Sequence, residues 1–81
     1  MKISRHPDKM CESLAELAHE QWSRWMQYLF DKSHANPDGT VTLPIWAVER
    51  WLRQMNTPYH ELSEEEKDSD RVEARRVLAI N

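Results

Sequence analysis

The residues of this sequence that most readily suggest catalysis are the adjacent pair His19-Glu20. Zinc proteases carry such a pair together with a second histidine four residues after the first, so that two imidazoles share one helix face. Position 23 is Ser23, so that motif is incomplete. The remaining histidines lie at an end or in predicted loops without ligand spacing: His6, His34 and His60. Without a cysteine cluster beside them, we expect no metal site.

Nucleophilic catalysis has no better support. The single cysteine, Cys11, has no nearby His–Asp signature, and no strand–turn–helix elbow presents a serine. The single glycine, Gly39, excludes glycine-rich phosphate loops. Carboxylates crowd residues 64–70, but a solvated helix start accounts for them. We therefore predict a protein that is not an enzyme, with no catalytic residues and no cofactor.

The remaining polar and aromatic side chains are suited to a small anionic ligand with a ring. Aromatic faces stack on a base, arginines form forked hydrogen bonds to phosphate, and carboxylates such as Glu20 and Asp70 accept from ribose hydroxyls. The candidates are His19, Glu20, Trp22, Arg24, Trp25, Trp46, Trp51, Tyr59, Lys67, Arg71 and Arg75. The competing interpretation is that the four tryptophans fill a thin core.

Composition limits the class of protein. The 81 residues make one domain, residues 1–81, whose core is so small that oligomerisation is a common remedy. A net charge of −3 argues against nucleic-acid binding and against an anionic membrane surface. A lone cysteine favours a reducing compartment, and neither a spanning apolar run nor an apolar signal segment is found. We expect a cytoplasmic location, with no nucleic acid and no membrane as partner.

Local signals predict the elements that must position these side chains. Apolar residues at spacings of three and four predict an amphipathic helix from Pro7 or Asp8 to Phe30. Residues 36–39, Asn-Pro-Asp-Gly, predict a tight turn, and residues 40–43 predict an extended arm or short edge strand. Pro44 should open a second helix that ends near Asn56, with its apolar face at Ile45, Val48, Leu52 and Met55.

A capping box at residues 63–66 predicts a third helix, which runs to about Ala79. This helix is acidic early and basic late, as its macrodipole favours. The predicted fold class is therefore all-α, with three helices and a short extended arm or edge strand between the first two. Whether the wide apolar half of the first helix is an internal core or an interface stays open.

Two segments are more specific. Residues 17–22, Leu-Ala-His-Glu-Gln-Trp, followed by Trp25-Met26 and Tyr28, and residues 57–71 from Thr-Pro-Tyr to Asp-Arg, resemble the RyR domain. This small helical repeat is named after ryanodine receptors and also occurs in bacteria and phages. Its first helix carries His-Glu, and a later Pro-aromatic-x-x-Leu segment opens its last helix. Residues 36–53 replace the Gly-Trp-x-Tyr-Gly stretch usual in that family.

The resemblance implies a role in nucleotide-linked signalling. The whole chain is similar to small phage and prophage proteins, and some phage proteins act as oligomeric sponges that sequester cyclic ADP-ribose isomers or cyclic dinucleotides in host defence. By this resemblance we expect a homo-oligomer that binds such a nucleotide as phage counter-defence in the host cytoplasm. The expected ligand-binding residues are His19, Glu20, Trp22, Trp25, Tyr59, Lys67 and Arg71.

Each central assignment has a structural alternative. His19 could be a core histidine that holds the loop before the third helix, Tyr59 a plug that docks the same loop, and Arg71 an ion-pair partner of Asp68. Other functions also stay open: an acidic inhibitor or adaptor that binds a host protein through residues 64–70, a DNA-binding regulator, or an enzyme that cleaves a nucleotide signal. Whether the pocket lies within or between subunits is likewise open.

Overall fold

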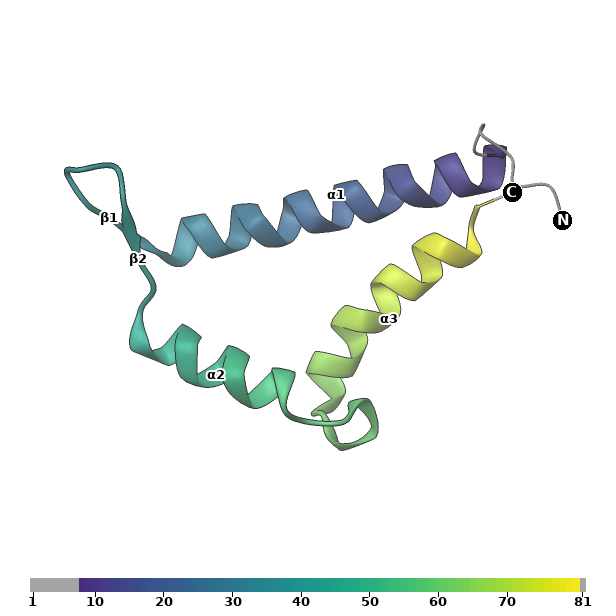
Figure 1. Cartoon of the computed structure of the whole chain (residues 1–81). Helices are drawn as coiled ribbons and strands as arrows, with labels where there is room; N and C mark the ends of the chain where they lie inside the picture. Colours follow the sequence, from purple (N-terminus) through teal and green to yellow (C-terminus); the bar gives the residue numbers. More distant parts are fainter. Residues whose placement is uncertain (1–7, 81) are drawn as a thin grey trace, which may run out of the picture.

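Three helices form the sides of an open triangle (Figure 1). The computed structural model describes residues 8–80. Helix α1 spans Lys9–Lys32, α2 spans Ile45–Met55 and α3 spans Glu64–Leu78. Between α1 and α2 lies an antiparallel hairpin of two short strands, β1 at His34–Ala35 and β2 at Val41–Thr42, and a 3-10 turn, η1, at Tyr59–Glu61 precedes α3. This confirms the predicted all-α class with a short strand between the first two helices.

The helices begin where their caps predict. The Asp8 carboxylate accepts a hydrogen bond from the amide of Cys11 at 2.6 Å, so Asp8 is the N-cap of α1. The predicted role of Pro7 lies outside the described residues. Ser63 caps α3 in the predicted capping box with Glu66. Pro44 is the N-cap of α2 rather than its first helical residue, a difference of one position.

The arm predicted at residues 40–43 is one side of a hairpin. Thr42 pairs with His34 and Val41 with Ala35. In the turn, the amide of Gly39 donates to the carbonyl oxygen of Asn36 at 3.1 Å, and Gly39 takes a φ of +88°, which glycine adopts without steric cost. The hairpin sets the distance between the end of α1 and the start of α2.

The sides of the triangle are held together mainly by polar and aromatic pairs. Arg24 of α1 forms an ion pair with Glu73 of α3 at 2.7 Å, and Arg53 of α2 forms one with Glu66 of α3 at 2.7 Å. The rings of Tyr28 and Trp51 join α1 to α2 at 6.4 Å. These contacts fix the helix arrangement without an apolar centre.

The chain alone buries almost no apolar side chain. Among the described residues, Ala47 is the only buried hydrophobic one. The apolar face predicted for α2 is mostly left uncovered: Ile45, Leu52 and Met55 are exposed, and Val48 is half-buried. None of the four tryptophans is buried, so they do not fill a core within one chain. The radius of gyration is 17.0 Å, whereas a compact domain of this length has one of about 12 Å.

Candidate functional site

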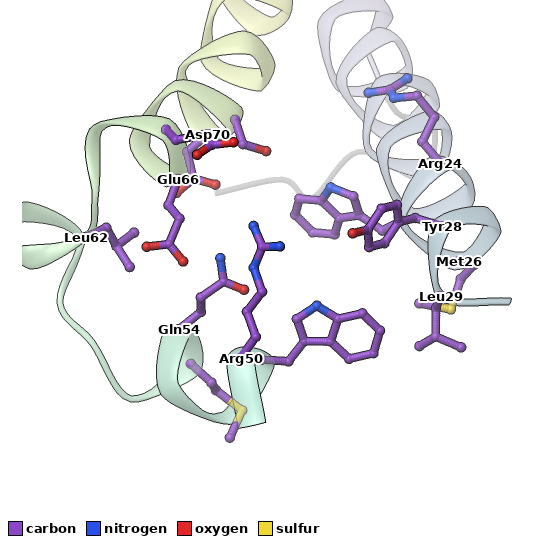
Figure 2. Close-up of a pocket in the computed structure, with 14 residues that line it drawn as sticks. Arg24, Met26, Tyr28, Leu29, Arg50, Gln54, Leu62, Glu66 and Asp70 are labelled. Carbon is purple, nitrogen blue, oxygen red and sulfur yellow. The ribbon is translucent and has the colours of Figure 1, made fainter. Parts of the chain in front are cut away.

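A groove of about 880 Å³ lies in the middle of the triangle and is lined by all three helices (Figure 2). Its apolar and aromatic lining comes mainly from α1 and α2, and its acidic lining from α3. The lining residues are Arg24, Trp25, Met26, Tyr28 and Leu29 of α1; Arg50, Trp51, Gln54 and Met55 of α2; and Leu62, Glu65, Glu66, Ser69 and Asp70 in or just before α3.

Aromatic rings form one wall of the groove. Trp25 and Tyr28 lie three residues apart, so they project from neighbouring positions on one face of α1. The wall continues on α2, where the ring of Trp51 lies 6.4 Å from that of Tyr28 and 6.4 Å from that of Trp46, edge to face with the latter. Such ring contacts fix the orientation of these aromatic side chains. The faces that remain uncovered are available for stacking.

The two arginines of the groove differ in whether they already form an ion pair. Arg24 donates two hydrogen bonds to the carboxylate of Glu73, at 2.7 and 2.8 Å, so its guanidinium is engaged. Arg50 forms no ion pair within residues 8–80. Figure 2 shows Arg50 reaching from α2 into the space between Glu66 and Tyr28. Arg50 is therefore the cation of the groove that can take an anionic ligand without breaking a pair.

Glu66 anchors the corner where α2 meets α3. Its carboxylate accepts hydrogen bonds from the guanidinium of Arg53 at 2.7 Å and from the amide of Ser63 at 3.2 Å. The hydrogen bond from Arg53, assisted by those from Ser63, lowers the pKa of Glu66 from 4.5 to about 2. Glu66 is thus charged at neutral pH and already neutralised by Arg53. It holds the groove's geometry rather than offering a free carboxylate.

The predicted ligand-binding residues fall into three places. Trp25 alone lines the groove. His19 and Trp22 stack on each other along α1, with ring centroids 6.0 Å apart, and Glu20 lies exposed beside them. His19 is exposed, so the alternative that made it a core histidine is wrong. No hydrogen bond, ion pair or ring contact among residues 8–80 joins this group to the segment around Tyr59.

Tyr59, Lys67 and Arg71 form a second cluster, on η1 and α3. The ammonium of Lys67 lies 5.9 Å from the ring centroid of Tyr59. Arg71 donates to the carboxylate of Asp68 at 2.7 Å and to that of Glu64 at 3.0 Å. These two hydrogen bonds raise the pKa of Arg71 above its ordinary value. The alternative that paired Arg71 with Asp68 is therefore confirmed, and its role as a phosphate clamp stays a prediction. Tyr59 is about half-exposed, so it does not plug the structure.

Sequence reasoning missed several residues of the groove. Tyr28 and Arg50 were not among the expected ligand-binding residues, and Trp51 entered only the broader set of candidates. The spacing of Trp25 and Tyr28, and of Trp46 and Arg50 four residues apart, marks each pair as sharing a helix face. Sequence spacing cannot show that these two helix faces meet, because their meeting depends on how α1 packs against α2.

Within the described range, no three histidine, cysteine, aspartate or glutamate side chains are grouped so as to hold a metal ion. None of the helices in residues 8–80 combines the length and apolar character needed to cross a membrane. Comparison of the chain with protein-family models, curated protein sequences and solved structures finds no match.

Proposed function

We propose that the chain is a non-enzymatic binder that sequesters a nucleotide-derived signalling molecule of the cyclic ADP-ribose type. The observation that supports it most is the groove, which aromatic rings of α1 and α2 line together with Arg50, a cation without an ion-pair partner among the described residues. Asp70 lies at the same groove. Ring, guanidinium and carboxylate are the three groups that recognise base, phosphate and ribose.

The assignment of roles follows from chemistry. The base would stack against Trp25 or Trp51, because an aromatic face is worth about 1–3 kcal/mol per stacked base. Arg50 would donate a forked hydrogen bond to a phosphate. Asp70 would accept hydrogen bonds from ribose hydroxyls. Glu65 and Asp70 in the same groove repel phosphate, so Arg50 would be the group that holds the phosphates.

Sequestration is consistent with such a site. A sponge needs only a protein concentration above that of its ligand and a Kd below the signalling level. A Kd of about 10 nM corresponds to about −11 kcal/mol. Stacking together with charge-assisted hydrogen bonds can supply this amount where the bound ligand is covered from water. The proposed biological role, phage counter-defence in the host cytoplasm, follows from the resemblance to phage sponges.

The alternative, an acidic inhibitor that binds a host protein, has weaker support. It relies on the acidic start of α3 as a charged surface. Lys67 lies 3.4 Å from Glu64, and Arg71 pairs with both Glu64 and Asp68. These internal pairs offset much of the negative charge that would steer toward a basic partner.

A thermal-shift panel tests the nucleotide proposal. The ligands are cyclic ADP-ribose and its isomers, linear ADP-ribose, cyclic dinucleotides, AMP and inorganic phosphate. A ligand at 100 times its Kd stabilises the folded protein by about 2.7 kcal/mol, so at least one nucleotide should raise the Tm by several degrees. Chromatography of the bound ligand after heat denaturation should return it intact. If no nucleotide raises the Tm, the proposal is wrong, and if a cleaved product is recovered, the chain is an enzyme.

A further inference from the structure

The described chain has far more surface than a compact protein of its mass. Its accessible surface is 7091 Å², whereas a folded monomer of 9.7 kDa is expected to expose about 5,100 Å². The difference is about 2,000 Å². Obligate homodimers bury about 2,000–5,000 Å² in total, which is about 1,000–2,500 Å² from each chain. The surplus surface of this chain thus has the size that one subunit of an obligate dimer contributes.

Large apolar side chains lie on this surface. Ile45 at the start of α2 is 71% exposed, Met55 at its end is 74% exposed, and Leu78 at the end of α3 is 81% exposed. A stable monomer does not leave such side chains of α2 and α3 in water, because burial of apolar surface is the main favourable term in folding. The caps and turns specify the helices locally, so the missing element is a partner for their apolar faces.

We infer that a second copy of this chain covers these faces and that the folded unit is a symmetric dimer. The surface carries charges of both signs, so a two-fold interface can place unlike charges of the two copies against each other. Glu12, Glu16 and Glu20 of α1 form no ion pair within residues 8–80, and neither does Arg75 of α3. A two-fold axis can bring such groups from opposite copies together at the rim of the apolar contact.

The dimer also bears on the groove, and this step rests on the proposed function. Trp25 and Met55 line the groove yet remain half-exposed or more. A ligand in the single chain would leave these side chains, and its own ring, open to water on one side. The second copy supplies the missing wall and lowers the local dielectric around Arg50, which strengthens a hydrogen bond to phosphate.

The first test is the mass of the chain in solution without nucleotide, measured by light scattering on a sizing column across a dilution series. The expected mass is about twice 9.7 kDa, with a Tm that rises with protein concentration. A mass of one chain throughout the series overturns the inference. Because no ligand is present, this result is separate from the success or failure of the nucleotide panel.

A double variant, Ile45→Gln with Leu78→Gln, locates the interface outside the groove. In a monomer these exposed positions tolerate glutamine with little change in Tm. In the dimer the variant should dissociate or lose its helical circular dichroism signal. The matched control, Glu49→Gln with Ala74→Gln, places the same residue at two other exposed positions of α2 and α3 and should keep the dimer mass. A double variant that stays dimeric with an unchanged Tm overturns the placement of the interface on these faces.

Discussion

At the scale of single residues, the two arginines Arg50 and Arg71 illustrate what determines availability for a ligand. Both carry a guanidinium group that could form forked hydrogen bonds to phosphate. Arg71 already donates to Asp68 and Glu64, so a phosphate would have to displace two carboxylates. Arg50 has no such competitor within residues 8–80 and lies at the groove. The energetic cost of binding therefore favours Arg50 as the phosphate contact.

Glu66 makes stability depend on pH. Its pKa is lowered from 4.5 to about 2 in the folded chain, so its charged form stabilises the fold above pH 4.5, and this contribution is lost as the pH falls toward 2. The Tm measured by circular dichroism should fall between pH 5 and pH 2 more steeply in the wild type than in Glu66→Gln. The comparison removes the contributions of other carboxylates such as Glu64. Equal pH slopes for the two proteins would show that Arg53 does not hold Glu66 as described.

At the scale of elements, the boundaries of the helices could be predicted because their signals are local. The side chains of Asp8 and Ser63 accept from nearby amides, and the ring of Pro44 fixes its own φ. The helices α1, α2 and α3 therefore begin within two residues of the predicted positions. The β1 strand and the η1 turn escaped prediction. His34–Ala35 has no alternating pattern of its own and becomes a strand only because β2 pairs with it.

Ser63→Ala tests how much of α3 depends on its cap. The Ser63 hydroxyl accepts from the amide of Glu66 at 3.2 Å, and loss of an N-cap typically costs about 1 kcal/mol. Urea denaturation should show this loss of unfolding free energy. Ser69→Ala, inside α3 and away from the cap, is the control and should be neutral or slightly stabilising because alanine is the better helix former. A Ser63→Ala protein as stable as the control would contradict the capping role.

At the scale of the whole molecule, prediction from sequence was limited by packing. An apolar stripe shows that a helix face needs a partner, but it does not say whether that partner is another helix of the chain or a second copy. For that reason Trp25 could be recognised as a candidate, whereas the groove that it lines together with Trp51 and Arg50 could not be predicted. The separation of the predicted ligand-binding residues into three places likewise depends on how the helices pack. The sequence predicts where these residues lie along each helix, but not the angles between the helices.

The most direct test of the binding account is a calorimetric titration of cyclic ADP-ribose, or of the isomer that raises the Tm most, into three proteins. These are the wild type, Arg50→Gln and Arg71→Gln. Each variant removes one guanidinium from a helix and puts glutamine in its place. The account predicts nanomolar binding by the wild type, at least tenfold weaker binding by Arg50→Gln, equal to about 1.4 kcal/mol, and little change in Arg71→Gln. Wild-type affinity in a folded Arg50→Gln variant would contradict it.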